Sequence, residues 1–219
     1  SSSATVYGDP KALPITESEP IKKAESPYGN TKQIGEEIIK DLVNSSSNFN
    51  AISLRYFNPI GAHPSALIGE LPIGIPQNLV PYITQTAIGK RNELTVFGDN
   101  YLTRDGSCIR DYIHVVDLAK AHIKSLEKLI KESSKNYYDA FNIGTGKGTS
   151  VLELISCFES VSGKKLNFRI GERRKGDIAK CFADVSKANE LLNWKSKHSI
   201  EDALLSSWNW EKHIKNEKL

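Results

Sequence analysis

The segment Ala51-Ile52-Ser53-Leu54-Arg55-Tyr56-Phe57 has the apolar density of a central β-strand, and the segments around it indicate the architecture. Upstream of it, residues 28–43 predict a helix, and residues 1–7 predict the C-terminal end of a buried strand. Downstream, Asn58-Pro59 is expected to end the central strand. Strands that alternate with helices predict an α/β fold in which the strands of the first part pair in parallel.

The rest of the chain continues this alternation after one long loop. Residues 61–77 are rich in Gly and Pro, and loops of this length inside compact domains are usually functional, so we expect this one to cover a bound ligand. A later helix is predicted from apolar residues that we expect to form its buried stripe: Val116, Ala119, Ile123, Leu126 and Ile130. The other expected elements are strands at 94–97, 140–143 and 166–170, and helices at 79–88, 151–163, 184–192 and 199–213.

Composition and charge argue against several classes of protein. Among 219 residues, 29 Lys and Arg against 26 Asp and Glu leave a formal net charge of +3. Both signs are mixed along the chain, which argues against a nucleic-acid or membrane-surface binder. Three cysteines without a C-x-x-C pair indicate reduced thiols in a cytoplasmic protein. The sequence has no long apolar run and no signal peptide, so we expect neither a membrane span nor secretion.

A candidate proton-handling pair lies at the start of the helix predicted at 28–43. Tyr28 and Lys32 stand in Ser26-Pro27-Tyr28-Gly29-Asn30-Thr31-Lys32, and residues i and i+4 share one face of a helix. The ammonium of Lys32 would favour the ionised form of the Tyr28 phenol, which makes the phenolate a candidate base. A hydroxyl from the serines at 1–3 would complete a Ser/Tyr/Lys site of the kind that accompanies hydride transfer. The alternative is a surface contact, since Tyr-x-x-x-Lys often arises by chance.

Eight segments taken together give a stronger signal than any single short motif, because several are long and unusual in composition. They are SSSATVYGD (1–9), SPYGNTK (26–32), LRYFNPIGAHPSALIGE (54–70), GIPQNLVPYI (74–83), VFGDNY (96–101), DGSCIRDYIHVVDLAKAH (105–122), FNIGTGKGTSV (141–151) and ERRKGD (172–177). In this order they resemble the UDP-galactose 4-epimerases of the extended short-chain dehydrogenase/reductase superfamily, and the resemblance covers essentially the whole chain. It implies the C-terminal part of an NAD-binding Rossmann domain, a doubly wound parallel sheet, plus a smaller mixed α/β substrate domain.

The resemblance also implies how the chain is divided. Residues 1–60 would form the C-terminal part of the Rossmann NAD-binding domain and carry the Ser/Tyr/Lys site. Residues 61–219 would form the UDP-sugar-binding domain, with some segments, about 109–143, returning to the Rossmann domain. The chain opens inside what reads as a strand end and contains no methionine, so we expect a truncated or processed fragment whose glycine-rich NAD loop lies upstream of Ser1.

The chemistry of the family is expected at three residues. Ser3, which directly precedes Ala4, matches the catalytic serine, and its alternative role is to cap the strand end. The resemblance implies that Tyr28 takes the proton from the sugar 4-hydroxyl while hydride leaves C4 for the nicotinamide of NAD, and that Lys32 binds the nicotinamide ribose. The resulting 4-keto sugar would turn in the pocket and take the hydride back on its other face, which inverts C4 without net redox change. Ser3, Tyr28, Lys32 and Tyr56 are the expected cofactor-binding residues.

A second set of residues is implied to hold the UDP-hexose. Guanidinium groups match phosphate oxygens bidentately and so suit the diphosphate, although an isolated arginine is more often a solvated surface residue. Asp177 is the expected acceptor for a ribose hydroxyl, with a local ion pair as its alternative. Phe97 is expected to pack along the uracil, with a place in the core as its alternative. The expected substrate-binding residues are Phe57, Asn58, Asn78, Leu79, Phe97, Arg110, Arg174, Asp177 and Cys181.

Cys181 carries a hypothesis about substrate choice. It aligns with a position where a bulky tyrosine restricts some family members to hexoses without an N-acetyl group. The smaller thiol predicts that UDP-N-acetylhexosamines are also accepted. The alternative is a buried cysteine with no part in substrate choice.

Two further features are assigned no part in the chemistry. Gly144, Gly146 and Gly148 lie between a strand and a helix, but Thr149 stands where G-x-G-x-x-G needs its third glycine. This spacing favours a tight turn over a phosphate cradle. None of the five histidines shows metal spacing, so we expect no metal site and assign no histidine to catalysis.

Two rivals to an epimerase stay open. Another nucleotide-sugar epimerase or dehydratase could share the scaffold, although Thr5-Val6 stands where a dehydratase would have an Asp-Glu pair after the serines. The other rival is a catalytically incomplete fragment that binds UDP-sugar. The resemblance further implies a homodimer, because the helices that precede and contain Tyr-x-x-x-Lys form the partner face in the superfamily.

Overall fold

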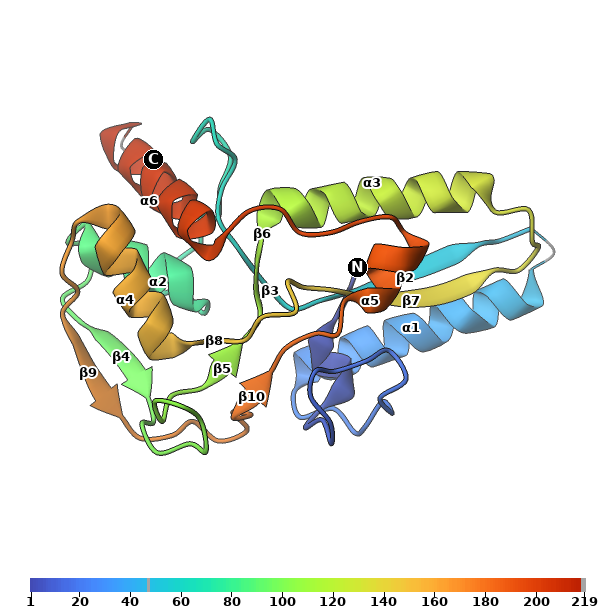
Figure 1. Cartoon of the computed structure of the whole chain (residues 1–219), viewed down its shortest axis with the longest axis horizontal. Coiled ribbons are helices and arrows are strands. Elements are labelled where there is room, and N and C mark those ends of the chain that lie inside the picture. The colour runs from blue at the N-terminus through green and yellow to red at the C-terminus, as the bar shows by residue number, and fades with distance from the viewer. Residues whose placement is uncertain (47, 218–219) are drawn as a thin grey trace.

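The structure, a computed structural model, describes residues 1–46 and 48–217. Its elements gather in two groups along the long axis of the molecule (Figure 1). We call the group around the three-stranded sheet the sheet lobe, and the group that contains α2, α4 and α6 the cleft lobe. Among the helices of the described residues, none combines the length and the apolar character needed to cross a membrane.

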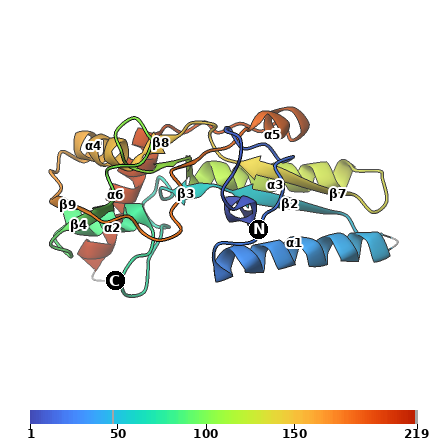
Figure 2. The same cartoon turned by 90° about the horizontal axis from the view of Figure 1, so that it is seen from below.

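The sheet lobe has one sheet with a helix on each face. Strands β1 (Ser2–Ser3), β2 (Ala51–Tyr56) and β7 (Tyr138–Ile143) lie in the order β1-β2-β7 and pair in parallel. Helix α1 (Pro27–Ser45) covers one face and α3 (Val115–Lys131) covers the other, as the turned view shows (Figure 2). The predicted α/β architecture with parallel pairing is confirmed.

The cleft lobe packs three helices against a two-stranded sheet. Helices α2 (Leu79–Ala87), α4 (Val151–Ser162) and α6 (Ile200–Glu217) lie beside β4 (Leu94–Phe97) and β9 (Phe168–Gly171), which pair in parallel. Helix α4 begins with the predicted capping box between Ser150 and Glu153. The buried core of this lobe comes mainly from the three helices and β4 and includes Val80, Ile83, Leu94, Val96, Leu154, Phe158, Leu204 and Trp208.

Short strands join the two lobes. Strand β3 (Asn58–Ile60) pairs in parallel with β6 (Tyr112–His114). Strand β5 (Ile109–Arg110) pairs in parallel with β10 (Lys180–Cys181) and antiparallel with β8 (Thr149–Ser150). The remaining helix, α5 (Ser186–Leu191), packs on β7.

One sequence-based expectation about strands was wrong. The strand expected over residues 1–7 is confined to β1, because the hydroxyl of Ser3 accepts a hydrogen bond from the backbone N–H of Thr5 (3.2 Å) and starts a 3₁₀ helix, Ala4–Tyr7. The central strand β2 ends at Tyr56, just before Asn58-Pro59 as expected, and the chain then changes partner and forms β3.

The prediction of which α3 residues are buried was also wrong. Ile123, Leu126 and Ile130 have exposed fractions of 57%, 58% and 75%. The helix packs on the sheet through Leu118 and Ala121, which are buried. The periodicity therefore identified an amphipathic helix, but its most apolar side faces away from the sheet of the described residues.

Candidate functional site

The first turn of α1 presents Tyr28 and Lys32. Ser26 caps the helix by accepting a hydrogen bond from the N–H of Gly29 (3.0 Å), and Pro27 takes the first helical position, where its missing N–H is not needed. Tyr28 is 55% exposed, and the ammonium of Lys32 lies 5.6 Å from the centroid of its ring. The predicted pair is therefore brought together at an accessible surface.

Ser3 lies beside this pair at the end of β1. Lys32 Nζ donates a hydrogen bond to the carbonyl of Ser1 (3.1 Å), and Ser3 pairs in register with Tyr56 at the end of β2. The Ser3 hydroxyl accepts from the N–H of Thr5 and so keeps its own proton to donate. The four expected cofactor-binding residues therefore lie at one edge of the sheet, where β1 and β2 end and α1 begins.

A histidine that the sequence analysis missed extends this edge. The hydroxyl of Tyr56 contacts the Oγ of Ser1 (3.0 Å) and forms a short hydrogen bond with Nε2 of His122 on α3. Burial raises the pKa of Tyr56 and lowers the pKa of His122. No spacing in the sequence links these two residues, which stand 66 positions apart.

A cleft lies at the junction of the lobes and holds most of the expected substrate residues. The space within it, counted together with its open mouth, is about 880 Å³. Gln77 and Thr95 also line it, although the sequence analysis did not select them. The expected residues that line the cleft are Asn58, Asn78, Leu79, Phe97, Arg110, Arg174 and Asp177.

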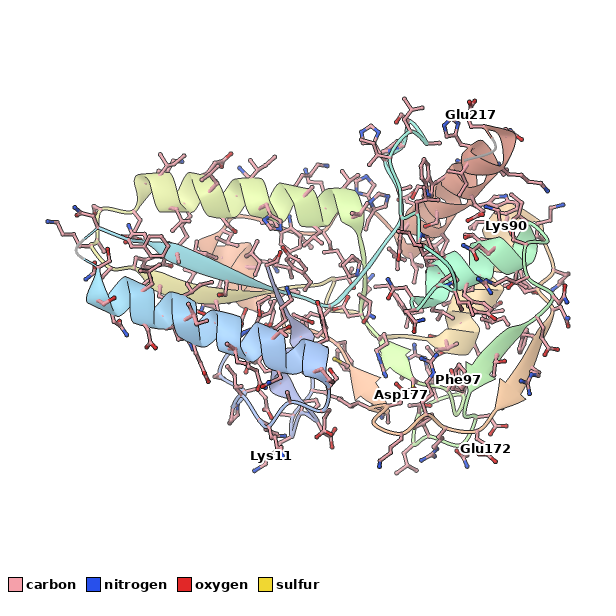
Figure 3. The ribbon with its side chains drawn as sticks, turned by 180° about the vertical axis from the view of Figure 1, so that it is seen from behind. Lys11, Lys90, Phe97, Glu172, Asp177 and Glu217 are labelled. Carbon is pink, nitrogen blue, oxygen red and sulfur yellow. The ribbon has the colours of Figure 1, made fainter. Side chains whose placement is uncertain are left out.

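Two cations, a carboxylate and the ring of Phe97 line this cleft together. The guanidinium of Arg174 lies 3.9 Å from the centroid of the Phe97 ring. Arg110 lies 3.7 Å from a carboxylate oxygen of Asp177, and its Nη1 donates to the carbonyl of Ile178 (2.6 Å). Figure 3 labels Phe97 and Asp177 at this junction. An aromatic ring and two guanidinium groups in one cleft can bind a flat base joined to an anion.

Two expected substrate residues do not line the cleft. Phe57 is 6% exposed and packs with Ala4, Tyr7 and Ile15 in a buried cluster. Cys181 lies beside Arg110 in the β5–β10 register and is half-buried. Burial raises the pKa of the Cys181 thiol to about 11, so the side chain is an uncharged thiol at neutral pH.

The glycine-rich turn at 144–148 does not offer its amides to a ligand. The backbone N–H groups of Thr145 and Gly146 donate to the carboxylate of Asp111 (2.8 and 3.0 Å), which also accepts from the N–H of Ala183. Gly146 has φ +77°, as a tight turn of this kind requires. Burial raises the pKa of Asp111, whereas these hydrogen bonds stabilise its charged form. The interpretation as a tight turn is confirmed.

A second histidine pair has a structural place, away from the cleft. His114 and His198 stack with ring centroids 4.3 Å apart. His198 Nδ1 lies 2.9 Å from the buried carboxylate of Asp117, which also accepts from the N–H groups of Lys197 and His198. His114 caps α3 by accepting from the N–H of Val116 (3.0 Å). These contacts fasten the start of α3 to the segment before α6.

Comparison with curated proteins finds close relatives. The chain is 52% identical over 211 residues to the UDP-glucose 4-epimerase of Bacillus subtilis (strain 168), a match that covers 96% of this chain and 61% of that protein. It is 54% identical over 211 residues to the UDP-glucose 4-epimerase of Dictyostelium discoideum, covering 96% of this chain and 60% of that protein. The chain therefore spans about three fifths of the length of these relatives.

Comparison with solved structures gives a matching result. The UDP-glucose 4-epimerase of Stenotrophomonas maltophila, solved with NAD and formylated UDP-arabinopyranose, superposes with a TM-score of 0.94 at 47% identity, covering 99% of this chain and 63% of that one. The enzyme from Bifidobacterium longum, solved with NAD+ and UDP, gives 0.91 at 48% identity with the same coverage. The sequence model of the GDP-mannose 4,6 dehydratase family matches residues 1–206, so the chain belongs to that family.

Proposed function

We propose that the protein that contains this chain interconverts UDP-galactose and UDP-glucose by inverting C4 of the sugar. The observation that carries the proposal is the segment from Tyr56 to Asn58, which joins the two sites. Tyr56 lies at the edge that holds Ser3 and Lys32, and Asn58, two residues later, lines the cleft. A substrate held in the cleft can therefore reach the proton-handling edge.

The proposed mechanism assigns the proton transfer to Tyr28 and supporting roles to Lys32 and Ser3. Tyr28, as phenolate, takes the proton of the sugar 4-hydroxyl as hydride leaves C4, and it returns a proton when hydride comes back to the opposite face. Lys32 stabilises the phenolate through its charge at 5.6 Å from the ring centroid. Ser3 donates a hydrogen bond to the sugar oxygen, because its own acceptor side is engaged by Thr5.

The residues at this edge fit NAD as cofactor. The exposed phenol of Tyr28 and the ammonium of Lys32 are donors suited to ribose hydroxyls, and the half-buried ring of Tyr56 offers a flat surface beside them. When bound, NAD would accept the hydride from C4 and give it back. The bound NAD in the similar structures supports this assignment.

The cleft is proposed to hold the UDP part of the substrate. Arg174 and Arg110 would face the diphosphate, Phe97 the uracil and Asp177 a ribose hydroxyl. Asn58, Asn78 and Leu79 would contact the UDP-sugar. Support comes from their shared place in one cleft and from the cation already held over the Phe97 ring. We further propose that residues 1–60 with about 109–143 serve the cofactor and the remainder of 61–219 the UDP-sugar.

Phe57 and Cys181 do not line the cleft, and we propose that they affect it indirectly. Phe57 is buried next to Asn58 and would support the segment that faces the sugar. Cys181 stands beside Arg110 in the β5–β10 register, and its small side chain would leave room for an acetamido group, which favours acceptance of UDP-N-acetylhexosamines as well.

A homodimer and a reducing compartment complete the proposal. Ile34, Ile38 and Leu42 form an exposed apolar stripe on α1, with exposed fractions of 44%, 61% and 45%, and such stripes mark protein interfaces. We propose that a second copy covers this stripe. The free cysteines among the described residues support a cytoplasmic location.

The deciding experiment measures formation of UDP-glucose from UDP-galactose by the purified full-length protein. Tyr28→Phe is expected to lower kcat by about 10²–10⁴-fold, the range for loss of a positioned acid–base group, without change in UDP affinity. Binding of UDP-galactose with no turnover in the wild-type protein would favour the non-catalytic rival. Formation of a 4-keto-6-deoxy sugar would favour the dehydratase.

The same assay tests substrate choice at Cys181. We expect the wild-type protein to epimerise UDP-N-acetylgalactosamine and Cys181→Tyr to lose that activity while it keeps activity on UDP-galactose. Equal activity of the variant on both sugars would contradict the assignment of Cys181.

A further inference from the structure

One face of α1 is fixed to the segment that carries Ser3. Gly29, Gln33 and Glu36 lie at positions i, i+4 and i+7 and therefore face the same side of the helix. Gly29 is buried, and the side-chain amide of Gln33 donates to the carbonyl of Val6 (3.0 Å). One carboxylate oxygen of Glu36 accepts from the hydroxyl of Ser2 (2.5 Å). Three successive turns of α1 are thus fastened to β1 and the 3₁₀ helix.

The direction of the catalytic side chains depends on this fastened face. Tyr28 and Lys32 each come one residue before a member of it, Gly29 and Gln33. One residue corresponds to a rotation of about 100° around the helix axis. A small rotation of α1 would therefore move the Tyr28 phenol and the Lys32 ammonium together, away from Ser3.

A buried ion pair opposes rotation of α1 about its axis. Glu36 and Arg55 are 2% and 4% exposed and form a bidentate pair, with Nε to Oε1 at 2.9 Å and Nη2 to Oε2 at 2.7 Å. Arg55 Nη1 donates to the hydroxyl of Tyr7 (2.9 Å), which donates to Asn142 on β7 (2.6 Å). Arg55 pairs in register with Ser2 on one side and with Asn142 on the other. The network ties α1 to all three strands of the sheet.

This network is a costly way to stabilise a fold. A buried ion pair often adds no more stability than apolar residues of the same volume, because both charges lose their hydration. Burial raises the pKa of Glu36, but the hydrogen bonds from Arg55 and Ser2 outweigh it and keep the carboxylate charged. The bidentate geometry has a fixed direction that apolar packing lacks, and this direction is what the neighbouring catalytic residues need.

We propose that Glu36 and Arg55 are positioning residues that set the rotation of α1 and, through Ser2, the place of Ser3. The proposal rests on the proposed function, since it assigns the geometry of that proton-transfer site. Glu36 acts on Ser3 through Ser2 and on Tyr28 and Lys32 through the helix. Arg55 immediately precedes Tyr56 and so fixes the fourth member of the edge.

The test is Glu36→Gln in the full-length protein, with kcat, KM for UDP-galactose and the pH profile of kcat as readouts. The matched control is Glu211→Gln in the cleft lobe, where a carboxylate that is 3% exposed accepts from Thr84 (3.0 Å) and pairs with Lys90 (2.9 Å). Both variants lose a buried charge, but only Glu36 lies on α1. A second variant, Ser2→Ala, removes the hydrogen bond to Glu36 and leaves the ion pair in place.

We expect Glu36→Gln to lower kcat by about 10–100-fold with KM changed less than about twofold. The acid limb of the kcat profile moves to higher pH, because a displaced Lys32 stabilises the phenolate less. Glu211→Gln leaves kcat and the profile unchanged. Equal effects of the two variants, or an unchanged kcat in Glu36→Gln, would overturn the proposal.

Two outcomes are decided separately. If Glu36→Gln does not fold, Ser2→Ala decides: a several-fold fall in kcat with the same profile shift supports the proposal, and an unchanged kcat overturns it. If the wild-type protein has no epimerase activity, the proposed function fails instead. The positioning proposal is then decided by a crystal structure of Glu36→Gln. Displacement of the Tyr28 ring and the Lys32 ammonium away from Ser3 supports the proposal, and unchanged positions overturn it.

Discussion

The two lobes use their helix faces in different ways. In the cleft lobe, α2, α4 and α6 surround an apolar core, in which Leu154, Phe158 and Leu204 are fully buried. In the sheet lobe, the inner face of α1 is held by a polar network around Glu36, and apolar stripes on α1 and α3 face outward. Apolar packing stabilises without fixing direction, whereas a network of hydrogen bonds fixes direction at a cost in hydration. The lobe proposed to move protons is the one with the directional contacts.

The largest expected effect tests the apolar core of the cleft lobe. Phe158→Ala should lower the free energy of unfolding by about 3–5 kcal/mol, because Phe158 is fully buried and packs edge-to-face on Trp208. Urea denaturation of the full-length protein measures it. Leu102→Ala, at a residue that is 91% exposed in the same lobe, should stay within about 0.5 kcal/mol. Similar losses in the two variants would show that the core assignment is wrong.

The outward face of α1 gives the next prediction. Ile38→Glu places a charge in the stripe proposed to meet a second copy, so the protein should change from dimer to monomer. Light scattering coupled to size exclusion measures the mass in solution. Leu102→Glu introduces the same charge at an exposed loop residue of the cleft lobe and should leave the mass unchanged. A wild-type monomer, or a variant that stays dimeric, would contradict the proposed interface.

The smallest expected effect concerns pH at the contact between α3 and α6. Burial and then the charge of His198 lower the pKa of His114, while Asp117 and Asp202 oppose this and Lys120 adds to it. Below the ordinary value of 6.5 the unfolded chain binds a proton that the folded chain does not, so stability should fall as pH falls through that value. Asp117, whose pKa is lowered by its hydrogen bonds despite burial, loses its contribution only at pH below 3.8.

Replacement of the His114 imidazole isolates its effect on the pH dependence of stability. His114→Asn keeps an acceptor for the N–H of Val116 but does not titrate, so the loss of stability between about pH 7 and pH 5 should become smaller. Thermal unfolding across this range measures it. His63→Asn, in an exposed loop, serves as control. An unchanged pH dependence in His114→Asn would contradict the assignment.

The sequence predicted what depends on local patterns. The start of α1 could be predicted from Ser26 and Pro27, the start of α4 from its capping box, and the parallel sheet from alternating strands and helices. Ser3, Tyr28 and Lys32 could be brought together because a strand end and a helix start adjoin in α/β folds. The resemblance led us to expect Phe97, Arg110 and Arg174 around one UDP-sugar, and the three residues do share one cleft.

What the sequence did not predict depends on contacts between distant residues. The outward stripe of α3 has the same periodicity as a buried one, so only the packing of Leu118 and Ala121 reveals which side meets the sheet. Likewise, the pairs Tyr56–His122 and Glu36–Arg55 are contacts between different elements, and neither has a spacing signature.

The carboxylate of Asp111 inside the glycine-rich turn bears on how such turns are compared across proteins. Successive amide groups that point into one concave space bind anions, and here a side chain from 34 residues upstream is that anion. Without an acid at position 111, the backbone N–H groups of Thr145, Gly146 and Ala183 would lose this acceptor. Two turns of the same shape can therefore bind different groups when an acidic residue from elsewhere in the chain fills one of them. A search for nucleotide sites by turn geometry has to ask which side chain already occupies the turn.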